Sequence, residues 1–231
     1  VLEPISLMDQ HGADAVRWYM LAAGSPWSAR RVGHEAISDV VRKTLLTYWN
    51  TISFHALYAE ASSFELSQSP AYEDRTIMDR WILSELNALI LDVDRAYSEF
   101  DSQSAGRVLA RFIDDLSNWY VRRSRRRFWD GDHAALATLH EAIVTISQLL
   151  APMVPFIAEQ AWQELVRVAD PKVPTSVHLT DFPIADESRI DSAVNKQVAM
   201  TRRVVELGRA ARAESSAAGR AARCARDAHQ P

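Results

Sequence analysis

The sequence predicts an all-α fold, an antiparallel helix bundle of about five to seven helices. Apolar residues recur at steps of three and four in one segment after another, which is the period of an amphipathic helix with one buried stripe. Short links rich in serine, proline, glycine and aspartate separate these segments, and such links favour antiparallel neighbours. At 231 residues and 48% hydrophobic, the chain can bury a sizeable core. We expect six residues in or near it: Trp49, Trp81, Leu86, Leu116, Trp119 and Tyr120.

The N-terminal residues are expected to form a connector followed by one helix. Pro4 should stop regular structure over residues 1–12, apart from a short helical turn. A helix opens at Gly12-Ala13-Asp14 and ends at Gly24. Because this helix is apolar almost all round, we expect its residues, Met20 included, to be deeply buried.

The remaining helices follow from the same periodicity, with Asp101 as the N-cap of the central one and Gly131 as its end. Ser176–Leu179 reads as short and extended. Beyond Glu214 the chain is an Ala/Arg tract, which we expect to be disordered or a frayed helix and attribute to a shifted reading frame or a truncated gene. The predicted helices are 35–60, 75–100, 101–129, 132–150, 156–168 and 189–212.

The central helix joins an apolar face to five arginines within six residues. A guanidinium is a planar, permanently charged fork that suits phosphate oxygens, and Trp129 adds a flat apolar face beside the cluster. Arginine interleaved with aromatic residues is typical of a surface for single-stranded or looped RNA. The alternative is a solvated helix end whose arginines pair with nearby carboxylates and carbonyls. The five are Arg122, Arg123, Arg125, Arg126 and Arg127.

A second candidate RNA contact is the polar loop that follows the first helix. It carries Trp27, Arg30 and Arg31. These side chains either touch RNA or cover the next helix, with Trp27 as a hydrophobic staple.

Composition limits the classes of function. The net charge of −4 excludes a uniformly basic RNA binder, so any RNA contact must be local. Cys224 is the only cysteine, which excludes a disulfide framework and a cysteine zinc site and fits a reducing cytoplasm. No apolar run is long enough for a membrane span. We find no phosphate loop, activated nucleophile or metal-ligand cluster, so no catalytic or metal residue is predicted, and His140 reads as a surface or satisfied histidine.

Several motifs resemble, in the same order, those of bacterial isoleucyl-tRNA synthetases, which are class I aminoacyl-tRNA synthetases. The resemblance extends from Val1 to about Arg209, and the arginine run favours the isoleucyl over the valyl relatives. The motifs are Gly12–Tyr19, Trp49–Thr51, Asp79–Ser84, Leu116–Trp129, Leu150–Phe156 and Ser176–Leu179.

The resemblance implies a domain organisation. Residues 1–33 would end the catalytic core and stem-contact region, with Gly12, Ala13, Asp14 and Arg17 as its motif. Residues 34–187 would form the helical anticodon-binding bundle of class I synthetases, 188–212 a C-terminal helix and 213–231 a disordered or aberrant tail.

The resemblance also implies partners. In the whole enzyme, ATP with magnesium activates isoleucine, which is transferred to tRNA(Ile). The catalytic and editing domains would precede this chain, so we expect no cofactor here, no activity of the fragment alone, a monomer and a cytoplasmic location. The arginine run and Trp129 would meet the tRNA backbone or the anticodon stem-loop, and Trp27, Arg30 and Arg31 would lie nearer the inner side of the tRNA bend.

Three alternatives remain open at this point. The chain could be the anticodon-binding domain of a valyl-type synthetase. It could be a non-enzymatic helical module that binds RNA or an acidic protein. It could also be a self-contained enzyme, which isoleucine-dependent pyrophosphate exchange would reveal.

Overall fold

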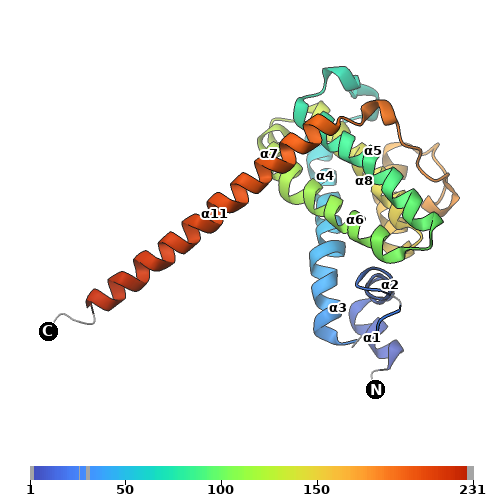
Figure 1. Cartoon of the computed structure of the whole chain (residues 1–231). Coiled ribbons are helices and arrows are strands. Elements are labelled where there is room, and N and C mark those ends of the chain that lie inside the picture. Colours follow the sequence, from blue (N-terminus) through green and yellow to red (C-terminus); the bar gives the residue numbers. More distant parts are fainter. Residues whose placement is uncertain (1–2, 26, 30–31, 228–231) are drawn as a thin grey trace. The chain divides into compact units, whose positions relative to one another are not determined.

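The computed structural model describes residues 3–25, 27–29 and 32–227, and the side chains of its last helix as far as residue 213 (Figure 1). Every regular element in these residues is helical, which confirms the predicted all-α class. The chain divides into two compact units, Val1–Ile190 and Asp191–Pro231.

Three π-helical turns join six of the eleven α-helical stretches in pairs. Eight continuous helices result in the described residues, more than the five to seven expected, because residues 4–11 form a helix of their own. Proline stands at the first position of that helix, where its fixed φ favours helix formation instead of stopping it. The stretches are α1 (Pro4–His11), α2 (Ala13–Ala22), α3 (His34–Val40), α4 (Leu46–Ala61), α5 (Ile77–Ser98), α6 (Ser102–Asp114), α7 (Arg122–Trp129), α8 (His133–Leu150), α9 (Pro155–Ala161), α10 (Arg167–Ala169) and α11 (Ser192–Asp227), and the π turns are η1 (Val41–Leu45), η4 (Asp115–Val121) and η5 (Trp162–Val166).

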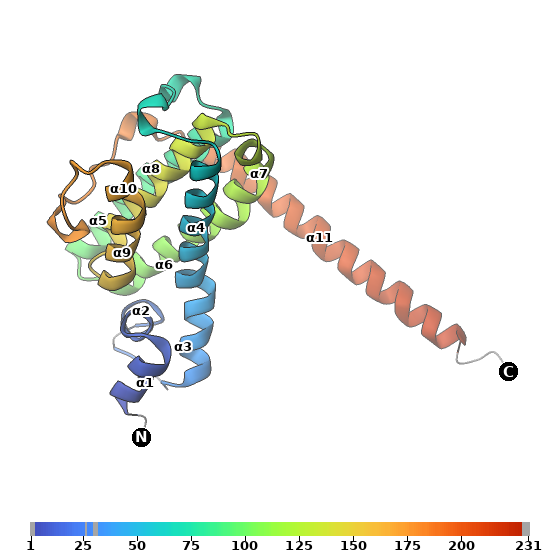
Figure 2. The ribbon, with the colours of Figure 1, turned by 180° about the vertical axis from the view of Figure 1, so that it is seen from behind.

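The core of the first unit lies between α4, α5, α8 and the continuous α6–η4–α7 helix (Figure 2). Each of these helices contributes a buried apolar stripe, as the periodicity predicted. Of the six expected core residues, Trp49 and Trp119 are half-buried. The other four are fully or almost fully buried: Trp81, Leu86, Leu116 and Tyr120.

The Gly-Ala-Asp helix, α2, is fastened to the bundle by polar contacts. The buried carboxylate of Asp14 accepts a hydrogen bond of 2.8 Å from the backbone N–H of Ile157, one of the N–H groups that the first turn of α9 leaves without a helical partner. The guanidinium of Arg17 lies 5.4 Å from the ring centre of Phe156. Asp14 and Arg17 therefore serve to position α9 against α2.

Three other predictions differ from the structure. Met20 is 52% exposed, because only one side of α2 faces the bundle. Residues Val177–Leu179 form a 3₁₀ turn and not an extended segment, and the Ser176 hydroxyl caps it by accepting from the N–H of His178. The last helix continues past Arg212 to Asp227, since alanine and arginine are strong helix formers.

Close packing of α2 on α6 depends on a glycine. A Cβ placed on Gly106 would lie 2.3 Å from the Cβ and 2.9 Å from the Cα of Ala22. The second of these atoms belongs to the backbone, so a longer side chain at position 106 would force the two helices apart.

We therefore expect Gly106→Ala to lower the free energy of unfolding of the first unit by about 1–2 kcal/mol, because overpacking outweighs a gain in helix propensity of about 1 kcal/mol. Urea unfolding followed by circular dichroism measures the change. Gly208→Ala, in a helix of the second unit where nothing lies within 4 Å of the added Cβ, is the control for helix propensity alone and should not destabilise the first unit. A Gly106→Ala protein as stable as the wild type would contradict the close approach.

Candidate nucleic-acid interface

The arginine-rich helix α7 is the end of one continuous helix that begins at Ser102. Asp101 caps it as predicted, with a carboxylate oxygen 2.9 Å from the N–H of Ser104. The buried stripe of α6 reaches the π turn η4 and resumes at Tyr120, Ser124 and Phe128. One side of the helix is therefore committed to the core along its whole length.

The π turn η4 is a feature that the periodicity did not predict. A π turn holds more residues per turn than an α-helix and so rotates the residues that follow it about the helix axis. With this turn in place, Tyr120, Ser124 and Phe128 continue the buried stripe. The positions between them face outward.

One of the five arginines faces a buried carboxylate. Arg127 binds Asp79 through two parallel contacts, Nη1 to Oδ1 at 2.7 Å and Nη2 to Oδ2 at 2.8 Å. Its Nε donates to Asp132 at 2.7 Å. The side chain of Asp79 is fully buried, and it also accepts from the hydroxyl of Tyr120 at 2.6 Å. Arg127 thus connects α5, α7 and the start of α8.

The electrostatics of this cluster follow from burial and pairing. Burial acts to raise the pKa of the Asp79 carboxyl, but hydrogen bonds from Arg127, Tyr120 and Thr76 outweigh it and hold the pKa below its ordinary value. Burial and the nearby Asp79 charge raise the pKa of Tyr120 well above its usual value. At neutral pH the cluster is an ionised pair with a neutral tyrosine that donates to it.

The other four arginines of the run are exposed. The guanidinium carbon of Arg123 lies 4.6 Å from the ring centre of Trp119, a cation–π contact that leaves the N–H groups available. Arg126 has a 94% exposed side chain, 3.7 Å from the carboxylate of Asp130. These arginines, together with Arg122 and Arg125, form an outward-facing basic surface, which we call the arginine surface.

A polar groove of about 440 Å³ lies between the middle of α4 and the η4–α7 segment. Arg122 and Arg125 form one side of it, together with Asn118. Asn50 and Thr51 of α4 form the other side. Both asparagines are exposed, and Asn118 donates to Asp114 at 2.7 Å, which leaves its amide oxygen facing solvent or ligand.

Sequence reasoning missed the two asparagines as functional candidates. Both lie in motifs that carried the resemblance, Trp49–Thr51 and Leu116–Trp129. The signal that could have found them is a polar amide on an otherwise apolar helix, next to an aromatic residue. Only the tertiary structure shows that Asn50 and Asn118 lie on opposite sides of the same groove.

The remaining predicted residues are distributed over the molecule. Trp129 is 77% exposed at the end of α7. Trp27 is 94% exposed in the link from α2 to α3, at the other end of the bundle from α7 (Figures 1 and 2). Arg30 and Arg31 lie outside the described residues.

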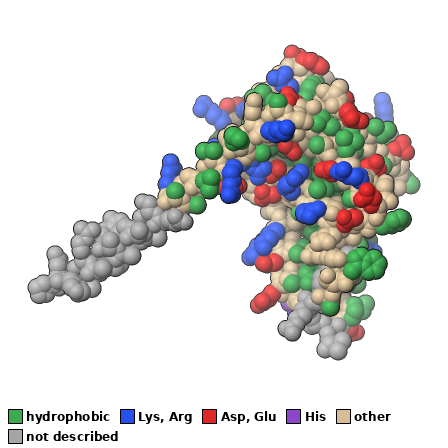
Figure 3. Space-filling model, in the orientation of Figure 1, with side chains coloured by type: hydrophobic (Ala, Val, Ile, Leu, Met, Phe, Trp, Pro, Cys, Tyr) green, Lys and Arg blue, Asp and Glu red, His purple; other side chains and the backbone are tan. Residues whose placement is uncertain are grey.

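Charge on the visible face of the molecule is mixed: Lys and Arg side chains lie among Asp and Glu (Figure 3). In the described part of the chain, no three or more His, Cys, Asp and Glu side chains are arranged to hold a metal ion. None of the described helices is long and apolar enough to cross a membrane.

Comparison with known proteins assigns the family. Residues 79–224, well over half of the chain, match the family described as anticodon-binding domain of tRNA ligase. The chain spans about a fifth of the length of the curated relatives it matches. The isoleucine–tRNA ligase of Streptomyces avermitilis is 61% identical over 216 residues, which is 93% of this chain and 21% of that protein. The corresponding ligase of Thermobifida fusca is 57% identical over 224 residues, which is again 93% of this chain and 21% of that protein.

Structural comparison agrees on the fold. The LeuRS of Agrobacterium radiobacter was solved in a ternary complex with tRNA and LeuAMS. The match covers 83% of this chain and 22% of that chain, with a TM-score of 0.61 and 18% sequence identity. The chain belongs to the family of anticodon-binding domains of tRNA ligases. Within that family, its sequence corresponds to the anticodon-binding region of the isoleucine–tRNA ligases.

Replacing Arg127 should destabilise the bundle, whereas replacing one of its exposed neighbours should not. We expect Arg127→Ala to lower the free energy of unfolding by about 3–5 kcal/mol, because Asp79 would remain buried without a counter-charge. Arg126→Ala, at an exposed pair, should change it by less than about 1 kcal/mol. Urea unfolding at pH 7 compares the two, and equal effects would show that Arg127 does not brace the bundle.

Proposed function

We propose that this chain is the tRNA-binding part of an isoleucine–tRNA ligase and that its partner is tRNA(Ile). The observation that carries the proposal is the arginine surface beside a polar groove lined by Asn50 and Asn118. The identities to isoleucine–tRNA ligases support the choice of ligase and hence of tRNA.

The arginine surface binds phosphates of the tRNA backbone. Its four guanidinium groups are exposed, and the ion pair shown for them in the described part of the chain is that of Arg126 with the exposed Asp130. Arginine forms two parallel hydrogen bonds to phosphate, and such contacts fix the position of a nucleic acid without reading its sequence. Arg127 is left out of this set, because its fork is already occupied by Asp79.

The groove accepts an unstacked base of the anticodon loop. Its volume of about 440 Å³ lies within the range of small-molecule sites, and a nucleobase is a small planar molecule. The amides of Asn50 and Asn118 offer both donors and acceptors to a base edge. The exposed ring of Trp129 gives a face on which a neighbouring base can stack.

In the whole protein, we propose, isoleucine is activated with ATP and magnesium and then transferred to the tRNA, in the cytoplasm and by a monomer. The parts that carry out these steps correspond to regions of the relatives outside the matched fifth. Trp27, Arg30 and Arg31 lie nearer the inner side of the tRNA bend in this proposal, and Gly12, Ala13, Asp14 and Arg17 belong to the stem-contact region. On its own, this chain should show no isoleucine-dependent pyrophosphate exchange.

A salt titration of tRNA binding tests the arginine surface. We expect alanine at Arg122, Arg123, Arg125 and Arg126 together to weaken binding of a tRNA(Ile) transcript and to reduce the slope of log affinity against log salt by about 3, since four phosphates would keep their counterions. Filter binding between 50 and 300 mM salt measures both.

The matched control removes the same charge elsewhere, from four exposed arginines away from the groove: Arg42, Arg80, Arg95 and Arg107. This control should keep most of the affinity and the slope. If both quadruple variants lose the same slope, binding follows overall charge. If neither variant loses slope, the arginines are simply solvated or bind an acidic protein partner, and the proposal for this surface fails.

The groove should provide discrimination between tRNAs. We expect Asn50→Ala and Asn118→Ala each to reduce the preference for tRNA(Ile) over tRNA(Val) by about fivefold, because one neutral hydrogen bond contributes about 1 kcal/mol. The salt slope should not change. Gln68→Ala, at an exposed amide away from the groove, is the control. An unchanged preference in both variants would exclude the groove as a base-reading site.

A further inference from the structure

A second cavity, of about 930 Å³, lies on a different part of the bundle and is not needed for the proposed RNA contacts. It is bordered by the C-terminal half of α4, the loop that follows it, α8 and the η5–α10 segment (Figure 2). Its volume is that of a small-molecule site. Its apolar walls include Phe64, Leu66, Leu165 and Val168.

Two buried histidines, His55 and His140, border the inner part of this cavity, with ring centres 5.4 Å apart. Burial lowers the pKa of His55 to about 3 and that of His140 to about 4, so neither carries charge at neutral pH. The Nε2 of His55 donates to the carbonyl oxygen of Leu136 at 3.2 Å. Its Nδ1 is then an acceptor, and among the described residues it has no partner.

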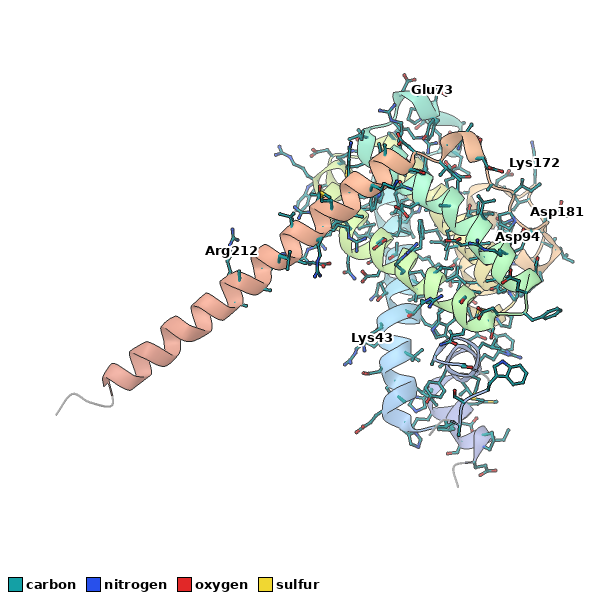
Figure 4. The ribbon with its side chains drawn as sticks, in the orientation of Figure 1. Lys43, Glu73, Asp94, Lys172, Asp181 and Arg212 are labelled. Atoms are coloured by element: carbon teal, nitrogen blue, oxygen red, sulfur yellow. The ribbon has the colours of Figure 1, made fainter. Side chains whose placement is uncertain are left out.

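The rim of the cavity is acidic. It carries four carboxylates, and none of the lysines and arginines in the described part of the chain lines the cavity. The hydrogen bonds to three of these carboxylates come from neutral donors: the Gln160 amide, the Ser67 hydroxyl and the Lys172 backbone N–H. The side chain of Lys172 itself extends away from the bundle (Figure 4). The four are Glu60, Glu65, Glu164 and Asp170.

We propose that this cavity binds a small organic amine with an apolar body, such as an arylalkylammonium ion. The apolar walls would bury the hydrocarbon part, and the rim carboxylates would attract the ammonium group, since among the described residues no lysine or arginine lines the cavity. An anion is disfavoured by the same carboxylates. A neutral molecule of equal shape would gain only the apolar contact.

The test compares three probes of nearly equal shape with the whole chain: 3-phenylpropylamine, 3-phenylpropanol and 3-phenylpropionate. Titration calorimetry should give a Kd of about 1 mM or tighter for the amine, which is a modest value for ten non-hydrogen atoms. The alcohol should bind at least about fivefold more weakly, and the carboxylate should show no saturation. If the amine does not saturate, or if amine and alcohol bind alike, the proposal fails.

Two matched variants localise the binding. Val168→Arg puts a cation on the rim at a side chain that is 76% exposed, and should abolish amine binding. Ile184→Arg makes the same change at a 92% exposed position that does not line the cavity, and should leave it intact. Both substitutions are at the surface, and unchanged thermal unfolding and tRNA binding verify the fold. Equal amine binding by both variants would place the ligand elsewhere and overturn the proposal.

Discussion

The buried carboxylate of Asp79 is the constraint on which the arrangement of the bundle depends. A charge without solvent contact needs a counter-charge and hydrogen bonds, and it obtains them from Arg127, Tyr120 and Thr76. Asp132 holds the remaining side of the guanidinium, and its other oxygen caps α8 by accepting from backbone N–H groups. One carboxylate and one guanidinium therefore join three helices.

This pairing also fixes the rotation of α7 about its axis. Successive residues of an α-helix point about 100° apart, so once Arg127 and Tyr120 face the core, the direction of every neighbouring side chain is set. Arg123 and Arg126 then point to solvent. Replacing a buried ion pair with apolar residues often costs no stability. Its contribution here is better understood as orientation, because the ion pair acts together with the buried Tyr120 and Phe128 to hold one face of α7 against the core.

The sequence predicted the helical elements, and it could not assign different roles to the individual arginines. The Asp101 cap, the buried stripes and the breaks between helices are local features, which depend on residues close together in the sequence and can be recognised there. Arg127 could not be distinguished from Arg126, because what distinguishes it is a partner 48 residues away. The groove and the amine-binding cavity share this difficulty, since each is assembled from segments far apart in the chain.

Helix α4 explains how one bundle can present both a surface that attracts anions and a cavity that attracts cations. Asn50 and Thr51 face the groove beside the arginines, whereas His55, Ala59 and Glu60 border the acidic cavity. At a rise of 1.5 Å per residue, Asn50 and Glu60 lie about 15 Å apart along the helix, more than the Debye length of about 8 Å at physiological salt. Charges at the two places therefore act almost independently. Net charge is a poor guide to the partners of such a chain, because a polyanion and an organic cation each respond mainly to the charges within about one Debye length of them.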